Sequence, residues 1–67
     1  MSKVKPVDTI LGPIDEQKFE ELKEGYGRAI EHRYDQFIWQ GQHVETKLAG
    51  YLLEYTSPLL GFGAFKQ

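Results

Sequence analysis

The chain has 67 residues, a formal net charge of -2 and no cysteine. A chain of this length forms one domain at most and buries only ~60% of the surface that its unfolded form exposes, so its core leaves a small margin of stability. The lack of cysteine excludes disulfides and most structural zinc sites, and we therefore expect helix packing, self-association or a bound partner to supply the remaining stability.

Charge and hydropathy disfavour several classes of partner. The small negative net charge creates no field that would attract nucleic acid, and Lys3, Lys5 and Lys66 are too few for a basic patch. The longest apolar run, 59–65, is far shorter than the roughly 20 residues of a membrane-spanning helix. No apolar signal-peptide core follows the N-terminal lysines. The sequence predicts a soluble, cytoplasmic protein that does not span a membrane.

Residues 1–14 are predicted to form an extended N-terminal arm. Pro6 and Pro13 push the residues before them toward extended conformations. The apolar residues of the arm favour burial, either on the chain's own helices or on a neighbouring subunit. A frayed terminus is the simpler alternative.

A helix is predicted to begin at Asp15, whose side chain can cap the first turn. Ile14 and Phe19 occupy the two positions of a hydrophobic staple, and Glu16 favours the positive end of the helix dipole. Apolar residues then recur at helical spacing, which predicts a helix over about 15–40. Its core candidates are Phe19, Leu22, Tyr26, Ile30, Phe37 and Ile38.

Two glycines lie inside this predicted helix. Gly25 and Gly27 would each cost ~1 kcal/mol relative to alanine in a helix interior. Gly25 and Ala29 could form a flat strip against which another backbone packs, or the helix could kink at 25–27. Both explanations are compatible with the sequence.

The best interior break is at 40–43, where Gly41 interrupts the pattern. Apolar residues then repeat at helical spacing until Ser57-Pro58, which predicts a second helix over about 43–56. The predicted fold class is therefore all-α, with two antiparallel helices forming a hairpin over 15–56. Core candidates in the second helix are Val44, Leu48 and Leu52.

A single long helix is one alternative to the hairpin. Phe19, Phe37 and Tyr55 are equally spaced along the chain, and the interval between them corresponds to a whole number of helical turns. A helix of ~40 residues would keep these side chains in phase, but it would need other chains to bury them.

A β-hairpin is the other alternative for the middle of the chain. Gln36–Gln40 and His43–Lys47 would be its strands. The residues that suit strands are Phe37, Ile38, Trp39 and Val44. Gly41-Gln42 would be its turn, but Gly-Gln is a weak turn signal. The clean helical spacing downstream favours the helical hairpin.

Residues 57–67 are predicted to form an irregular, apolar tail. Gly61 and Gly63 exclude a regular element, while the large apolar side chains between 59 and 65 are costly to leave in water. We expect this tail to dock on its own hairpin, on another subunit or on a larger partner.

No pattern indicates catalysis, a cofactor or a metal ion. His32 and His43 are the only histidines, and they lack the spacing of a metal-binding motif. Ser2 and Ser57 have no histidine at a suggestive spacing, and 61–63 lacks the flanking strand and helix of a phosphate loop. The carboxylates of the first helix indicate a solvated face. We therefore expect a protein that is not an enzyme.

Aromatic residues are abundant for so short a chain. Tyrosine and tryptophan are enriched at binding hot spots, because they bury a large area at low entropic cost. Trp39 lies off the apolar face of the first predicted helix, so it either covers the turn or contacts a partner. The interface candidates are Trp39, Tyr34, Tyr51, Tyr55, Leu59, Leu60, Phe62 and Phe65.

The small size, the apolar ends and the aromatic surplus together indicate a non-enzymatic protein-interaction module. We expect a self-associating subunit or an accessory component of a larger assembly, for which virion-type particles are an analogy only. One alternative is a small inhibitor or adaptor that binds and regulates a larger enzyme through Trp39 and residues 59–65. A second alternative is an oligomer that sequesters a small ligand between helices. Nucleic acid is an unlikely partner on grounds of charge.

Overall fold

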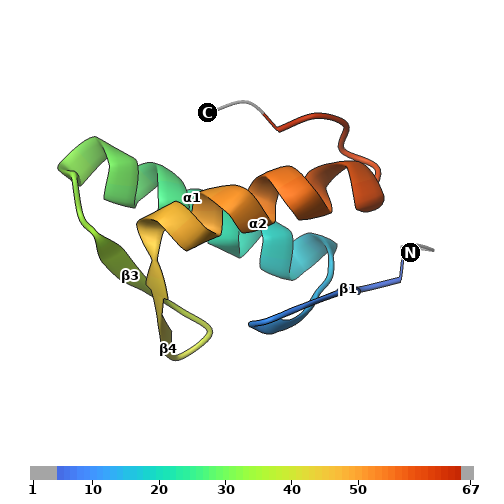
Figure 1. Cartoon of the computed structure of the whole chain (residues 1–67), viewed down its shortest axis with the longest axis horizontal. Coiled ribbons are helices and arrows are strands. Elements are labelled where there is room, and N and C mark those ends of the chain that lie inside the picture. The colour runs from blue at the N-terminus through green and yellow to red at the C-terminus, as the bar shows by residue number, and fades with distance from the viewer. Residues whose placement is uncertain (1–4, 66–67) are drawn as a thin grey trace.

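The computed structural model describes residues 5–65, which form two β-hairpins and two α-helices (Figure 1). Strands β1 (Val7–Thr9) and β2 (Gly12–Ile14) make the first hairpin, and β3 (Gln36–Trp39) and β4 (Gln42–Glu45) make the second. Helix α1 (Glu16–His32) follows the first hairpin, and helix α2 (Thr46–Leu59) follows the second. The predicted all-α class is therefore wrong, because the fold is α+β with two antiparallel two-stranded sheets.

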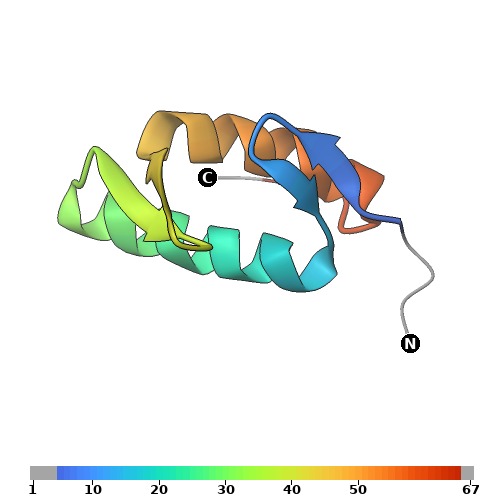
Figure 2. The same cartoon turned by 90° about the horizontal axis from the view of Figure 1, so that it is seen from below.

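The two helices lie side by side and run in opposite directions (Figure 1). Both hairpins lie on one side of the helix pair, and residues 60–65 cross its other side. The first hairpin extends across α2, while the second extends across α1 (Figure 2). Each hairpin therefore leads into one helix and covers part of the other.

The fold consists of two ββα units that follow one another along the chain. Val7 pairs with Ile14 in the first hairpin, and Phe37 pairs with Val44 in the second. The two helices begin at Glu16 and Thr46. These residues are separated by the same number of positions as Val7 and Phe37. We refer to this constant step between the units as the ββα correspondence. Positions buried in both units are Ile14 and Val44, Phe19 and Ala49, Leu22 and Leu52, and Tyr26 and Thr56.

Side-chain hydrogen bonds close the turn of the first hairpin. The hydroxyl of Thr9 accepts from the backbone N–H of Leu11 at 3.1 Å and donates to the carbonyl of Gly12 at 2.8 Å. Gly12 has a φ of 102°, which glycine adopts at no steric cost. The prediction of an extended arm over 1–14 is thus replaced by a hairpin over residues 7–14, and residues 1–4 lie outside the described part of the chain.

Helix α1 begins where the sequence predicted. The carboxylate of Asp15 accepts from the backbone N–H of Lys18 at 2.8 Å, so the predicted cap is confirmed. The helix runs unbroken through the two glycines but ends at His32, well before the predicted end near residue 40. At its end Arg33 adopts a left-handed conformation, and the N–H of Tyr34 donates to the carbonyl of Ala29 at 2.8 Å. These two features make a Schellman motif.

The β-hairpin that the sequence left as an alternative is present at 36–45. Gln40 and Gly41 both have positive φ, which is the requirement of a two-residue type I′ turn. The turn lies one residue earlier than the Gly41-Gln42 turn considered from the sequence. In β3 the side chains alternate, so that Trp39 is buried and Ile38 is exposed.

Helix α2 covers 46–59 rather than the predicted 43–56. Two hydrogen bonds of Thr46 fix the start of the helix. The backbone N–H of Thr46 donates to the carbonyl of Asp35 at 2.8 Å, and the hydroxyl of Thr46 donates to the carbonyl of Tyr34 at 2.7 Å. Pro58 does not end the helix but lies in its last turn. The end follows at Gly61, which has a φ of 88° and forms a second Schellman motif.

The core fills the space between the helices and the hairpins. Of the predicted core residues, Phe37 and Leu48 are partly buried, whereas Ile30 and Ile38 are more than half exposed. The predicted burial of Ile30 and Ile38 is therefore wrong. Ile30 lies on the outer face of α1, and Ile38 lies on the outer face of β3. The core consists of Ile14, Phe19, Leu22, Tyr26, Trp39, Val44, Ala49, Leu52, Leu53 and Leu60.

Candidate interaction surface on helix α2

Three large side chains on the outer face of α2 are not covered by the fold. Tyr51, Tyr55 and Leu59 expose 59%, 56% and 53% of their surface, respectively. Their spacing of four residues places them along one face of the helix. We call these three residues the α2 stripe. The partly buried Leu48 extends the same face toward the start of the helix.

The opposite face of α2 is fully used by the core. Ala49, Leu53 and Thr56 are almost completely buried, and Gly50 admits the ring of Tyr26. A Cβ at Gly50 would lie 3.1 Å from Cε1 and from the hydroxyl oxygen of Tyr26. The helix is therefore apolar on both faces, as is typical of a helix that packs against a second structure on its outer side.

The ββα correspondence shows that α1 has no such stripe. Glu21 and Gly25 occupy the positions of α1 that correspond to Tyr51 and Tyr55. The second hairpin covers both: the side-chain amide of Gln40 donates to the carboxylate of Glu21, and the ring of Phe37 packs on Gly25. The equivalent surface of α1 is thus occupied within the chain.

The first hairpin leaves more of α2 open. Ile10 lies in its turn, corresponds to Gln40, and exposes 80% of its surface. That turn lies over α2 (Figure 2). Ile10 is not among the candidates predicted from the sequence, because its position in a proline-containing segment gives no signal for a turn beside a helix. It adds exposed apolar surface on the α2 side of the molecule.

Trp39, the leading interface candidate, is part of the core. It exposes only 4% of its surface, and its indole N–H donates to the backbone carbonyl of Lys18 at 3.2 Å. The tryptophan thereby connects the end of β3 to the first turns of α1. It offers no surface to a partner.

The remaining candidates lie at different places. Leu60 is buried at 2% exposure, and Tyr34 is exposed next to His32, with ring centroids 5.4 Å apart. Phe62 and Phe65 belong to the tail, which folds back on the chain's own helices. Of the eight candidates, the structure brings only Tyr51, Tyr55 and Leu59 together on one exposed helix face.

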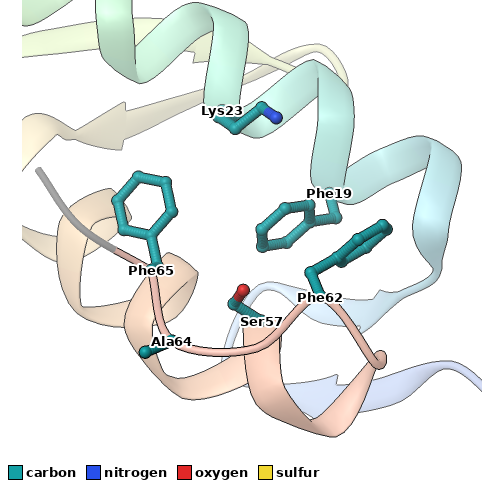
Figure 3. Close-up of a pocket in the computed structure, with 6 residues that line it drawn as sticks. All are labelled: Phe19, Lys23, Ser57, Phe62, Ala64 and Phe65. Carbon is teal, nitrogen blue, oxygen red and sulfur yellow. The ribbon is translucent and has the colours of Figure 1, made fainter.

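The tail forms a pocket of about 380 Å³ against α1 (Figure 3). The rings of Phe19 and Phe62 stack with centroids 4.9 Å apart, and Phe65 meets Phe19 edge-on at 6.4 Å. The hydroxyl of Ser57 donates to the carbonyl of Gly63 at 2.6 Å and fixes the path of the tail. Among the described residues that line the pocket, Lys23 is the one with a charged side chain.

The positive charge of Lys23 is already partly neutralised by a neighbouring carboxylate. The ammonium of Lys23 lies 3.3 Å from the carboxylate of Glu20 and 6.0 Å from the centroid of the Phe19 ring. The pocket is consequently apolar at its base and close to neutral at its rim.

Among residues 5–65, the hydroxyl of Tyr26 is the titratable group with a perturbed pKa. Burial raises the pKa of the Tyr26 hydroxyl above its ordinary value of 10.0, and the negative charge of Glu54 raises this pKa further. Glu54 is on the flank of α2 that faces α1, one position before the stripe residue Tyr55. The stripe itself contains no charged residue.

Residues 5–65 contain neither a metal-binding cluster nor a membrane-spanning helix. Between residues 5 and 65, no three histidine or acidic side chains lie close enough to hold a metal ion. His43 is on β4, opposite Ile38, whereas His32 is the last residue of α1. No helix within the same range is long and apolar enough to cross a membrane.

Comparison with known proteins identifies no relative. The chain matches no family model, no curated protein and no solved structure.

Proposed function

We propose that the chain is a small non-enzymatic protein-interaction module that self-associates as a subunit or accessory component of a larger protein assembly. The α2 stripe supports this proposal most directly. Tyr51, Tyr55 and Leu59 remain more than half exposed although the opposite face of their helix is packed into the core. Tyrosine is enriched at binding hot spots, and an uncharged, contiguous apolar face marks a contact surface.

The size of the chain supports the same proposal. A 67-residue domain without disulfides has little stability to spare. Covering the α2 stripe in an assembly removes apolar surface from water and so adds stability that the monomer lacks. The absence of cysteine is compatible with assembly in the cytoplasm.

Sedimentation and light scattering of the purified full-length chain test this proposal. We expect the average mass to rise above that of one chain as the concentration is raised through the micromolar range, and the thermal midpoint to rise with it. A monodisperse monomer across that range overturns self-association. That outcome favours the alternative of a small inhibitor or adaptor, which would use the same stripe on a different protein.

The tail pocket favours a second candidate function, the binding of a small ligand. Its volume of about 380 Å³ falls in the range of roughly 300–1,000 Å³ that ligand pockets occupy. The phenylalanine rings suit a flat aromatic ligand, and Lys23, whose ion pair with Glu20 is exposed and therefore weak, can pair instead with a carboxylate of that ligand. Titration with naphthoate tests this candidate by NMR. Shifts confined to Phe19, Phe62 and Phe65 that are lost in Lys23→Met support it, and no shifts at millimolar naphthoate refute it.

A further inference from the structure

We propose that the partner of the α2 stripe is the same stripe of a second copy, packed antiparallel across a twofold axis at the level of Leu53. In this arrangement Tyr51 of each copy lies beside Tyr55 of the other. The inference rests on the proposed function, since it specifies which surface self-associates and in which direction. An isologous contact of this kind closes at two subunits.

The spacing of the stripe suits pairing with another helix. Leu48, Tyr51, Tyr55 and Leu59 follow steps of three and four residues, the spacing of a helix–helix seam. Helix α2 has 14 residues, so it is ~21 Å long at the usual rise. The seam extends over nearly this whole length. A second α2 therefore covers the stripe from end to end, with aromatic rings opposite aromatic rings.

The ends of α2 carry complementary charges for an antiparallel pair. Lys47 lies in the first turn, next to Leu48 of the seam, and the last turn contains no basic residue. The carbonyl groups at the end of a helix carry a partial negative charge, which a nearby cation stabilises. With the axis at the level of Leu53, Lys47 of one copy stands opposite Leu59 of the other. Lys47 of each copy thus supplies the cation that the last turn of α2 lacks in the other copy.

A parallel pair does not have this complementarity. It would place the two Lys47 side chains side by side at one end and two helix C-termini at the other. Glu54 comes one turn after Gly50, which packs against the ring of Tyr26, so Glu54 lies on the flank of α2 that faces α1. The seam itself is therefore free of acidic side chains. The charges at the helix ends therefore favour the antiparallel arrangement.

The exposed area sets the expected affinity. The two tyrosines and one leucine leave roughly 400 Å² of apolar surface per copy, estimated from the area that such side chains bury. A standard stable interface buries about 800 Å² per partner. Because the α2 stripe falls short of this area, we expect a weak dimer that dissociates in the micromolar range.

The first arm of the test identifies the surface. Tyr55→Glu places a charge at the centre of the seam, and Ile30→Glu is the matched control, because Ile30 is similarly exposed on α1. We expect Tyr55→Glu to weaken dimerisation at least about thirtyfold by sedimentation and Ile30→Glu to change it less than about twofold. Circular dichroism checks that both variants are folded. An unchanged dissociation constant for Tyr55→Glu overturns the inference while the chain still self-associates.

The second arm of the test identifies the direction. Lys47→Glu is expected to weaken the dimer about tenfold, because it brings a carboxylate to the partner's negative helix end at two symmetric places. Adding Leu59→Lys is expected to restore most of that loss, once the apolar contact that Leu59→Lys removes by itself is subtracted with the single variant as reference. The two positions lie ~18 Å apart along one helix, so the new charges can pair only between antiparallel copies.

Arg28→Glu, at an exposed position of α1, is the control for net charge and should leave the dissociation constant unchanged. Failure of Leu59→Lys to restore the Lys47→Glu dimer overturns the antiparallel arrangement. A wild-type chain that stays monomeric overturns the proposed function itself, so the two failures can be told apart.

Discussion

The ring of Phe37 lies directly on Gly25 of α1, so that a Cβ built on this glycine would come within 2.6 Å of Cε2 of the ring. This contact joins the second hairpin to the first helix. It also explains the glycine, since any larger residue would push the strand away from the helix. The flat strip expected from the sequence is therefore used by an aromatic side chain rather than by another backbone.

Two alanine substitutions in α1 separate this packing effect from helix propensity. Gly27→Ala should raise the free energy of unfolding by about 1 kcal/mol, because its Cβ would meet nothing within 4 Å. Gly25→Ala has the same gain in propensity but overpacks Phe37 at a cost of ~1–3 kcal/mol, so we expect a net loss of about 1 kcal/mol. Urea denaturation measures both values. A gain for Gly25→Ala would show that the hairpin can shift without cost.

The C-terminal ends of the two helices allow a reciprocal experiment. Arg33 has a φ of 60°, a conformation that costs a non-glycine residue ~1–2 kcal/mol, and Gly61 holds the left-handed position after α2. After subtracting the greater backbone entropy that glycine loses on folding, we expect Arg33→Gly to stabilise the chain by about 0.5–1 kcal/mol. Gly61→Ala should destabilise it by about 1 kcal/mol. Stabilisation by Gly61→Ala would contradict this explanation of both caps.

The sequence predicted the helices better than the strands, and the reason lies in the residues 36–39. Phe37 and Ile38 both continue the helical spacing from Phe19, so the whole of β3 was assigned to a helix. Only Arg33 in a left-handed conformation stops the helix, and arginine gives no signal for such an end. The capping residue Asp15, by contrast, has an interaction that can be recognised from the sequence alone.

The repeat and the interaction surface differ in how far they could be predicted. Under the ββα correspondence, only Leu22 with Leu52 and Glu24 with Glu54 are identical between the two units, so the repeat is not visible in the sequence. The tyrosines of α2 were proposed as interface residues from their chemistry. Their exposure depends on how far each hairpin covers the opposite helix, a long-range relation that no local pattern specifies.

Tyr26 makes stability depend on pH in the alkaline range. Because burial and Glu54 raise its pKa above 10.0 in the folded chain, the unfolded chain loses this proton at a lower pH. The stabilisation is therefore fully present below pH 10 and is lost as the pH rises through the folded-state pKa. Unfolding free energies measured above and below pH 10 should fall more steeply with pH in the wild type than in Tyr26→Phe.

The aromatic rings of the tail should contribute to folding and not to association. Phe65 is half-buried and meets both Phe19 and Tyr26 edge-on, with its centroid 6.1 Å from that of Tyr26. We expect Phe65→Ala to lower the free energy of unfolding by about 2 kcal/mol and the more exposed Phe62→Ala by about 1 kcal/mol. Sedimentation should show the same dissociation constant for both variants and the wild type. A weakened dimer with unchanged stability would instead place the tail in the contact between copies.

Trp39 was predicted to be an interface residue but lies in the core, and substitutions at this position test its contribution to stability. Trp39→Phe keeps most of the buried ring but leaves the carbonyl of Lys18 without its indole donor, so we expect a loss of about 1–2 kcal/mol. Trp39→Ala should cost ~3–5 kcal/mol, which is enough to unfold a chain of this size. Circular dichroism follows unfolding in these variants, and the emission of the single tryptophan reports on the wild type. At equal folded concentration, Trp39→Phe should dimerise like the wild type. If Trp39 instead contacted a partner, the substitution would weaken association and leave the free energy of unfolding unchanged.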